Sequence, residues 1–270
     1  PVGRVEYLHL HPLAFDEFLL AIGEQQAHEA YTTIPTPAFA EAKLLRLFHR
    51  YVLVGGMPAA VARYAHTDGD MTRTRQVYAE LLIAFRDDIP KYARNSTHRQ
   101  VLMHCLDAAP QLVGTRITFH GFGGSNYRSR EAGEALRTLE RAMLLSLMFP
   151  TTQVELPLLL DRRKSPRLQF LDTGLVNYRL GLQQQLMGVE DLNDTYRGRI
   201  IEQVVGQELL ARGTFEASAP VFWVRDKAQS QAEVDFILQL GSDCIPVEVK
   251  SGAAGKMRSL HQFMARSAAP

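Results

Sequence analysis

The sequence predicts a mixed α/β protein in which helices dominate the first half and strands gather towards the end. Apolar residues recur at helical spacing in several segments before residue 145. Two apolar runs then flank a basic, proline-containing turn between residues 152 and 172, as in a hairpin. From residue 196 the pattern changes to a helix, three short strands and a final helix. The chain therefore divides into a helical part to about residue 66, a helix-plus-hairpin part to about residue 195 and an α/β part after it.

The composition fits folded domains. The chain has 270 residues, which by length alone suggests roughly two domains. With 46% hydrophobic and 22% charged residues, it has enough apolar material for hydrophobic cores and no sign of global disorder. The formal net charge of +1 says nothing about partners by itself, so any basic surface must come from local clustering.

The cysteine content and the absence of long apolar runs limit the cellular setting. The two cysteines, Cys105 and Cys244, stand far apart in apolar surroundings, which fits a reduced cytoplasmic protein without a disulfide framework or a thiolate metal site. No signal peptide is evident, and no apolar run reaches the ~18 residues that a membrane helix needs. Because the chain begins at Pro1 rather than at a methionine, we expect it to be a fragment of a longer protein.

The helical part begins after a short alternating segment. Residues 4–10 alternate as in a strand, and residues 15–22 then open a helix with Phe15, Phe18 and Leu19 on one side. Residues 41–64 predict two helical pieces. They are split by Gly55, Gly56 and Pro58.

The middle part predicts further helices before the hairpin. Residues 71–107 read as helical with an interruption at Pro90, and residues 130–147 form a third amphipathic segment. The expected buried face of this third segment consists of Ala132, Ala135, Leu136, Leu139 and Met143.

In the α/β part, charged residues interrupt two apolar strands. Side chains alternate between the faces of a strand, so residues two apart share a face. For the strand 233–240, the alternation puts Val234, Phe236, Leu238 and Leu240 on one face and Glu233, Asp235 and Gln239 on the other. For the strand 245–250, it puts Val247 and Val249 on one face and Glu248 and Lys250 on the other.

These charged residues predict either a metal site or a solvated face. If the two strands form an antiparallel hairpin, Asp235 can lie beside Glu248, and two adjacent carboxylates suit a hard divalent cation such as Mg²⁺ or Mn²⁺. Lys250 on the same face could orient a water molecule or stabilise charge that develops on a phosphate. Glu202, at the border of the apolar stripe of the preceding helix, could reach the same place. The alternative is an ordinary hairpin with charges on its wet face.

The order of these motifs resembles the PD-(D/E)xK nuclease-like fold. The helix followed by "VDF", "PVEVKSG" and "SLHQF" is similar to that fold, with Glu202, Asp235, Glu248 and Lys250 on its four motif positions. The rest of the chain is similar to the region that follows the ATPase domain in a large family of prokaryotic AAA-type ATPases. Five segments carry this second resemblance: "GRVEYLHLHPLAFDEFL", "HRYVLVGGMPAAV", "FLDTGLVNY", "GRIIEQVVGQEL" and the nuclease-like motifs themselves.

The resemblance implies three parts and a set of roles. Residues 1–66 would be the end of an ATPase core and its helical lid, residues 67–195 a winged-helix-like domain, and residues 196–270 a restriction-endonuclease-like domain. Asp235 and Glu248 would hold the metal, Lys250 would assist the attacking water, and Glu202 would complete the acidic pocket. No G-x-x-x-x-G-K-[ST] loop occurs, so ATP would bind only to a domain upstream of Pro1. The chain also ends where the nuclease-like fold normally adds a further strand.

A second candidate site is a set of basic residues suited to DNA. A turn at 162–167 and the helix before it carry these residues, which are Arg162, Arg163, Lys164 and Arg167 in the turn and Arg130, Arg137 and Arg141 on the helix. Helix followed by basic hairpin is the layout of a winged helix, and phosphate contacts from such side chains would give salt-sensitive affinity. The alternative is a solvated face, because charge runs usually have that role and Glu131, Glu134 and Glu140 dilute the positive field of the helix.

Two functions of different classes remain open from the sequence. The first is DNA binding with metal-dependent phosphodiester cleavage, favoured by the presence of all four motif residues. The second is a non-catalytic module that uses an inactive nuclease fold to dock the ATPase to protein or DNA. The missing final strand and the missing ATPase half favour this module.

Overall fold

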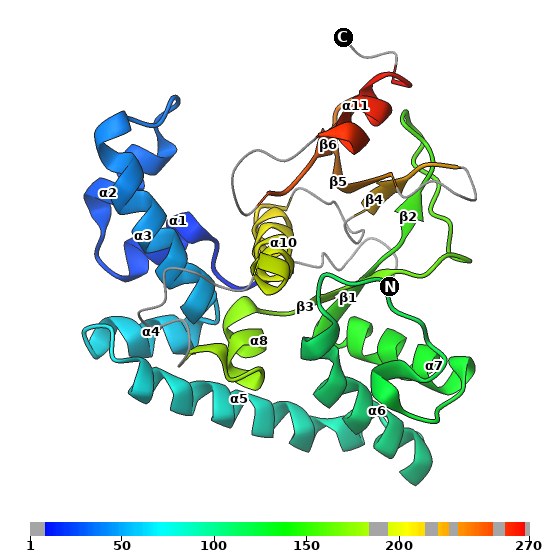
Figure 1. The fold of residues 1–270 in the computed structure, drawn as a ribbon. Coiled ribbons are helices and arrows are strands. Elements are labelled where there is room, and N and C mark those ends of the chain that lie inside the picture. Colours follow the sequence, from blue (N-terminus) through cyan, green and yellow to red (C-terminus); the bar gives the residue numbers. More distant parts are fainter. Residues whose placement is uncertain (1–8, 184–193, 214–220, 227–231, 251–256, 268–270) are drawn as a thin grey trace, which may run out of the picture.

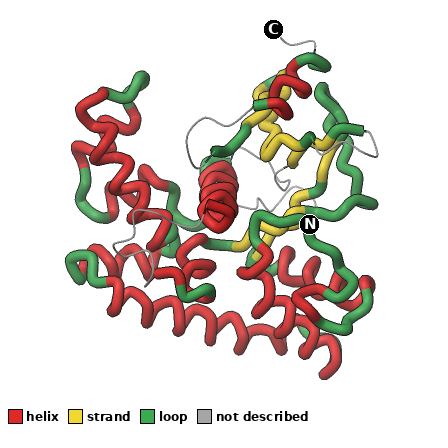
Figure 2. Tube along the Cα trace, in the orientation of Figure 1, coloured by secondary structure: helices red, strands yellow, loops and turns green. Residues whose placement is uncertain are grey.

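The computed structural model describes residues 9–183, 194–213, 221–226, 232–250 and 257–267, and it is a mixed α/β structure (Figures 1 and 2). The first helices are α1 (Phe15–Ala21), α2 (Gln25–Thr32), α3 (Ala38–Val54), α4 (Pro58–His66), α5 (Met71–Tyr92), α6 (Ser96–Ala108) and α7 (Ser129–Arg141), with 3₁₀ turns η1 (Ala109–Leu112) and η2 (Phe122–Gly124) between α6 and α7. The remaining elements are β1 (Leu145–Met148), β2 (Pro150–Thr151), β3 (Arg167–Phe170), α8 (Thr173–Arg179), α10 (Asp194–Ala211), β4 (Val221–Val224), β5 (Glu233–Leu240), β6 (Asp243–Val247) and α11 (Arg258–Met264).

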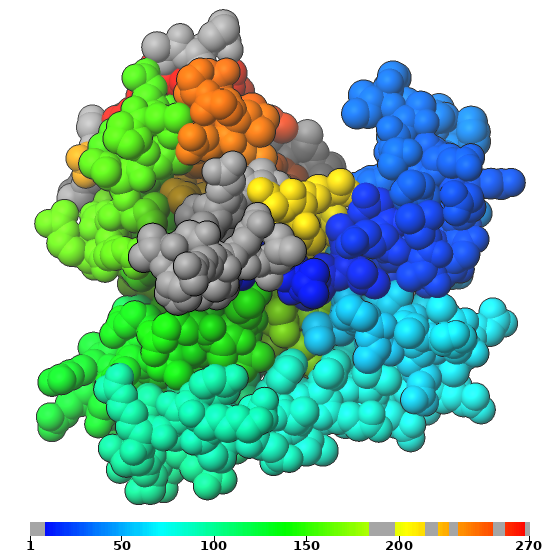
Figure 3. Space-filling view, turned by 180° about the vertical axis from the view of Figure 1, so that it is seen from behind, coloured from blue at the N-terminus to red at the C-terminus, as the bar shows by residue number. Residues whose placement is uncertain are grey.

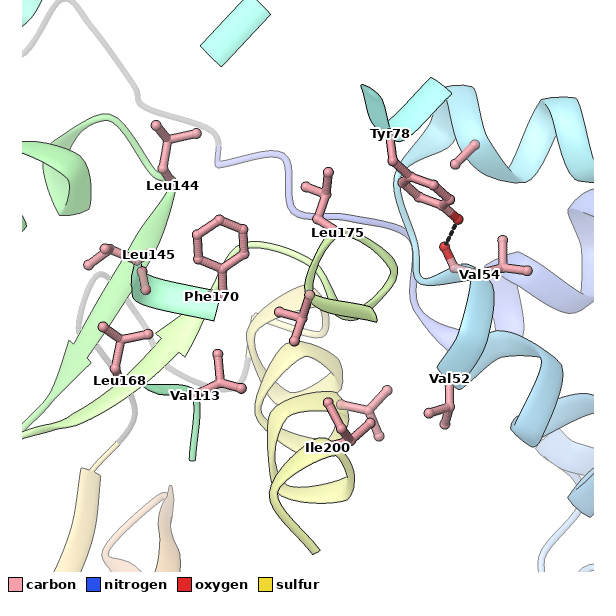
Figure 4. Close-up of a cluster of buried hydrophobic side chains, with 14 of the residues drawn as sticks. Val52, Val54, Tyr78, Val113, Leu144, Leu145, Leu168, Phe170, Leu175 and Ile200 are labelled. Carbon is pink, nitrogen blue, oxygen red and sulfur yellow. Dashed lines mark hydrogen bonds between the residues drawn. The ribbon is translucent and has the colours of Figure 1, made fainter. Parts of the chain in front are cut away.

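One hydrophobic core joins the parts that the sequence divides at residue 66. It runs from Phe15 in α1 to Val204 in α10 and takes side chains from α1 to α8, β1 and β3 on the way. Figure 4 shows a part of it in which Phe170 of β3, Leu175 of α8 and Ile200 of α10 lie together. The long helix α5 runs along one side of the molecule, with α4 near one end and α6 and α7 near the other (Figure 1).

Asp172 fixes the turn between α3 and α4. This aspartate is fully buried, and its carboxylate accepts hydrogen bonds from the backbone N–H groups of Gly56 (2.6 Å) and Leu175 (3.0 Å). Gly55 has φ +71°, and a Cβ there would lie 2.4 Å from an Asp172 oxygen, so this position requires glycine. Tyr78 of α5 donates to the carbonyl of Val54 at 2.5 Å, the dashed line in Figure 4. The segments around Gly55 and Asp172, far apart in the sequence, therefore lock together.

The strands form two sheets, and a strand of the middle part belongs to the C-terminal one. β1 and β3 form an antiparallel pair, while the larger sheet has the order β2–β4–β5–β6. In the larger sheet, β2 is parallel to β4 and the other neighbours are antiparallel. Trp223 of β4 packs edge-on against Phe263 of α11 on one face, with Val154 and Leu156 nearby. α10 covers the other face, where its side chains pack with those of β4, β5 and the segment after β6.

The hairpin expected around residues 152–172 has a different form. The strand that pairs with β3 is β1, with Leu145 opposite Phe170, and the segment between them packs on the C-terminal sheet. β1 takes this place because it follows α7 directly and its leucines complete the core over that helix. The basic turn is thus the end of a long connection rather than the tip of a two-stranded wing.

Most expected helices are confirmed, with two corrections. The helices on either side of Gly55 and Pro58 are present, and Phe15, Phe18 and Leu19 are buried as predicted. The interruption expected at Pro90 comes later: α5 continues to Tyr92, because a proline this close to the helix end removes one hydrogen bond and the Ala93 N–H still reaches the Ile89 carbonyl.

The second correction concerns Met143, which is not part of the buried face of α7. The helix ends at Arg141, and Met143 is 38% exposed with φ +60°. The chain must turn sharply here to enter β1, which removes Met143 from the helical periodicity. The other four predicted residues of that face are buried.

Two further helices, α2 and α8, form where the sequence predicted none. The strand expected at residues 4–10 lies outside the described residues, except for residues 9 and 10, which are not in a strand.

The face assignment of β5 is wrong in part. Between β4 and β5 the register shifts, with Val221 opposite Ile237 but Trp223 opposite Val234. This bulge places Val234 with Trp223 and Phe236 with α10, so the two do not share a face.

Candidate carboxylate site

The structure brings the four motif residues together at one end of the C-terminal sheet. Glu202 comes from α10, Asp235 from β5, and Glu248 and Lys250 from the segment after β6. Asp235 accepts the backbone N–H of Val249 at 2.9 Å, which ties it to the residue between Glu248 and Lys250. Lys250 donates to Glu248 at 2.5 Å. These residues, with Glu233 and the arginine described next, are called the carboxylate cluster below.

Arg167 lies at the centre of this cluster. Its guanidinium is 3.1 Å from Asp235 and 3.2 Å from Glu202, and it also pairs with Glu233. Only 13% of the side chain is exposed, and it lies over the ring of Phe222 at 5.1 Å from the centroid. The sequence placed Arg167 with the basic turn as a DNA contact. The structure corrects that position, because Arg167 begins strand β3 and points inwards among carboxylates.

Burial and like charges raise the pKa of Glu202. Burial is the larger cause, the charges of Asp235, Glu233 and Glu248 add to it, and Arg167 opposes them, so the pKa of Glu202 is about 7 instead of 4.5. The pKa of Lys250 is raised, first by its hydrogen bond to Glu248 and then by the nearby carboxylates, so this side chain is a cation at neutral pH.

The cluster carries an excess of negative charge. Four carboxylates meet three cationic side chains, since Arg116 also pairs with Glu233, and the formal excess is one negative charge when all are ionised. Carboxylate oxygens are the ligands preferred by Mg²⁺ and Mn²⁺. One oxygen is available: Glu248 Oε2 is buried and has no hydrogen-bond partner among the described residues. The donor chemistry therefore fits a hard divalent cation.

The present arrangement is nevertheless closed by protein groups. Both oxygens of Asp235 are engaged, one by Arg167 and the other by the N–H of Val249. Within the described part of the chain, no three histidine, cysteine or acidic side chains are grouped closely enough to hold a metal ion. A cation that used Asp235 and Glu248 together would require Arg167 to release Asp235.

The basic turn remains at the surface but is partly neutralised. Arg163 is 92% exposed and pairs with Asp161 at 3.2 Å, and Lys164 lies 4.0 Å from the same carboxylate. The hydrogen bonds from Arg163 lower the pKa of Asp161. Arg162 lies over the ring of Phe149, 5.1 Å from its centroid. The turn thus presents three cationic groups against one carboxylate.

The arginines predicted on the helix lie on the exposed face of α7. Arg130, Arg137 and Arg141 are all exposed. The glutamates that dilute their charge have structural partners. Glu131 accepts the N–H of Arg128 at the start of the helix, Glu140 accepts the N–H of Leu147, and Glu134 pairs with Arg94. The acidic side chains of α7 are therefore held by the fold. Among its arginines, Arg141 donates to the Thr138 hydroxyl at 2.9 Å and Arg137 lies 6.0 Å from the centroid of the Phe119 ring, and both remain exposed.

Sequence reasoning missed the central role of Arg167 and the participation of Glu233 and Arg116. One signal was available for Arg167. Polar and apolar residues alternate over residues 167–170, as in a strand, and this pattern makes Arg167 the first residue of a strand rather than part of the turn. The pairing of Arg116 with Glu233, 117 residues apart, has no local signal.

Two family models match the chain. Residues 45–186, just over half of its length, match a domain of unknown function, DUF8612, and the chain belongs to that family. Residues 197–269 match a second domain of unknown function, DUF4143. Neither a curated protein nor a solved structure gave a match. The carboxylate cluster combines the two matched regions, with Arg167 from the first and its acidic partners from the second.

None of the helices in the described ranges is both long and apolar enough to cross a membrane. Both cysteines are buried and free of disulfide bonds. Burial raises the pKa of Cys105 to about 12, so this thiol is a packing residue rather than a nucleophile.

Proposed function

We propose that this protein binds DNA and that its C-terminal part is a PD-(D/E)xK nuclease-like domain with metal-dependent phosphodiester chemistry. In this proposal it works within an AAA-type ATPase whose nucleotide site lies upstream. The observation that carries the proposal is the gathering of Glu202, Asp235, Glu248 and Lys250 from three separate segments into one cluster with excess negative charge.

Each residue of the cluster has a role in this proposal. Asp235 and Glu248 would hold Mg²⁺ or Mn²⁺, and Glu202 would complete the acidic pocket. A bound divalent cation supplies Lewis acidity and lowers the pKa of a water molecule. Lys250, protonated and held by Glu248, would offset charge on a phosphate oxygen. DNA would approach over the basic turn and the exposed arginines of α7, whose phosphate contacts require no particular base sequence.

Cation binding tests the proposal without relying on activity. Mn²⁺ or Mg²⁺ at a hundredfold excess over its dissociation constant should raise the free energy of unfolding of the wild type by ~2.7 kcal/mol. Thermal melts measure this stabilisation. The Asp235→Asn, Glu248→Gln double variant should show little shift, because neutral amides are poor ligands for a hard ion. The matched control is the Glu80→Gln, Asp87→Asn double variant, which removes one glutamate charge and one aspartate charge from the exposed face of α5. Equal shifts in all three proteins would place the ion outside the cluster.

A second candidate is favoured by Arg167. Its guanidinium already occupies the space between Asp235 and Glu202 and supplies the positive charge that a metal would bring. The alternative proposal is therefore a non-catalytic module, with a nuclease-like fold that docks the ATPase to protein or DNA.

Arg167→Gln separates the two candidates. Removing the internal cation should strengthen Mn²⁺ binding if the carboxylates are a metal site that Arg167 closes. A module without a metal site should show no Mn²⁺ shift in either the wild type or Arg167→Gln. Arg116→Gln is the control, because Arg116 pairs with Glu233 but not with Asp235.

A further inference from the structure

A pocket lies beside Glu208 of α10, between this helix and the N-terminal arm formed by α1, α2 and α3. Figure 3 shows the arm in blue standing beside α10 in yellow. The pocket has a volume of about 350 Å³, which is within the range of small ligand sites. It is lined by Phe15, Tyr31, Thr36, Glu41, Leu44, Leu45, Phe48 and Glu208.

Three aromatic rings, Phe15, Tyr31 and Phe48, form part of the pocket wall. Phe15 stands edge-on to Tyr31 with ring centroids 5.2 Å apart, and edge-on to Phe48 at 5.4 Å. Ring faces attract cations because of their quadrupole. The protein already uses one of them in this way, since the guanidinium of Arg212 lies 6.0 Å from the centroid of Tyr31.

The charged side chains of the lining are acidic. Glu208 and Glu41 contribute carboxylates, and the lining contains no lysine, arginine or histidine. Glu208 uses Oε1 to accept the N–H of Phe15 at 2.8 Å. Its Oε2 is buried without a hydrogen-bond partner among the described residues, and Arg212 Nε lies 3.8 Å away while the same guanidinium pairs with Asp16 at 3.1 Å. Tyr51 also lies close to this carboxylate. Burial raises the pKa of Glu208, and the interaction with Tyr51 opposes this larger effect. Oε2 therefore has an ion-pair partner but no hydrogen bond of good geometry within the described part of the chain.

Apolar side chains near the pocket lining in sequence are exposed. Leu45, which belongs to the lining, is 56% exposed. Ile34 and Phe39, two residues before and three residues after the lining residue Thr36, are 93% and 88% exposed. Large apolar side chains with this exposure are of the kind that a partner covers.

We propose that this pocket binds a lysine side chain carried by an apolar segment of a partner protein. The aliphatic stem lies along Leu44, Leu45 and the aromatic rings, and the ammonium donates to Glu208 with Glu41 nearby. A compact ammonium suits a carboxylate with one oxygen already engaged, whereas an arginine fork needs two. The apolar residues beside the lysine cover Ile34 and Phe39. This site is separate from the carboxylate cluster and does not depend on its function.

The chemistry is tested with butylammonium as the probe and 1-butanol as its neutral counterpart, using saturation-transfer NMR. Butylammonium should bind and butanol should not. Leu45→Glu should strengthen binding several-fold and Leu45→Arg should abolish it. Both variants place a charged side chain at the same exposed position and differ in the sign of the charge. Equal binding of the two probes, or equal binding by the two variants, overturns the proposal.

The carboxylate and the source of the lysine are tested in the same assay. Glu208→Gln should weaken butylammonium binding about tenfold, the loss of one charge-assisted hydrogen bond. Glu29→Gln on the exposed face of α2 is the matched control and should bind as the wild type does. A capped Leu-Leu-Lys-Leu-Phe peptide should bind at least tenfold more tightly than butylammonium. The analogue with glutamine in place of the lysine should lose this tighter binding. If the peptide binds no more tightly than butylammonium, the pocket is a site for a free amine and the proposal of a protein partner is wrong.

Discussion

Asp172 and Asp235 are both buried aspartates, but their surroundings differ in kind. Asp172 is held by backbone N–H groups of Gly56 and Leu175, which are fixed in place and do not titrate. Asp235 is held in part by the side chain of Arg167, which also serves Glu202 and Glu233. A carboxylate satisfied by backbone is part of the fold, whereas carboxylates that share one side-chain cation and keep a negative excess form a site that a ligand can change.

The largest effect is expected from removing the carboxylate of Asp172. Asp172→Ala leaves the buried N–H groups of Gly56 and Leu175 without acceptors, and it should lower the free energy of unfolding by about 4 kcal/mol. Urea titration followed by circular dichroism measures it. Asp87→Ala, at an exposed position of α5, should change stability by less than about 0.5 kcal/mol. A loss below about 1 kcal/mol for Asp172→Ala would mean that the turn at Gly55 is held by other contacts.

Removing the shared cation should have the next largest effect, and the effect should depend on pH. Arg167→Gln leaves Glu202, Glu233 and Asp235 without their common partner, and should cost about 3 kcal/mol at pH 8. The cost should be smaller at pH 5, because Glu202, already shifted to a pKa of about 7, is then protonated. Urea titrations at both pH values measure this difference. A cost independent of pH would show that Arg167 acts through packing on Phe222 alone.

The third prediction concerns the pH dependence of stability. The pKa of Glu202 is raised from 4.5 to about 7, so between these values the folded protein binds more protons than the unfolded chain and stability falls as pH rises. Glu202→Gln cannot ionise. Its stability relative to wild type should therefore increase by about 2 kcal/mol between pH 4.5 and 7. A constant difference over this range in thermal melts would place the pKa of Glu202 near its usual value.

The smallest effect on stability is expected at the basic turn, where the effect on DNA binding should be clear. Replacing Arg162, Arg163 and Lys164 with alanine should change the free energy of unfolding by less than about 0.5 kcal/mol. DNA affinity should fall. The slope of the logarithm of the binding constant against the logarithm of the salt concentration should become less negative by about 2, because fewer counterions are released. Arg46, Arg50 and Arg63, exposed on α3 and α4, are the matched control for the same charge change. An unchanged slope in the turn variant would make the turn ordinary solvated surface.

Local patterns predicted the parts of the fold that local physics determines. Apolar spacing located α1, α3, α4 and α7, and alternation located β4, β5 and β6, because these patterns come from one buried face within one element. The bulge in β5 has no such signature, since it depends on how β4 pairs with it, and it moved Phe236 to the α10 face. α8 is short, and its N-terminus depends on the cap from Asp172.

Four residues of the candidate site were predicted from the sequence, but Glu233, Arg116 and the cation at its centre were not. Glu202, Asp235, Glu248 and Lys250 were placed together from strand alternation and from resemblance to a known fold. Arg167 was assigned to the basic turn instead, because its contacts with the carboxylates depend on the pairing of β3 with β1 and on the packing of β3 against α10. Tertiary contacts decide which charged side chains from distant parts of the sequence become ion-pair partners. The pattern of a single sequence does not show these contacts.

The parallel pairing of β2 with β4 bears on whether the two matched regions can be separated. β2 belongs to the DUF8612 region and β4 to the DUF4143 region, yet Thr151 lies opposite Trp223 in one sheet. The second region produced without β2 would therefore leave β4 as a bare sheet edge, which is a template for pairing with other chains. Separating the two regions at their junction removes a strand from the sheet as well as a connection along the chain.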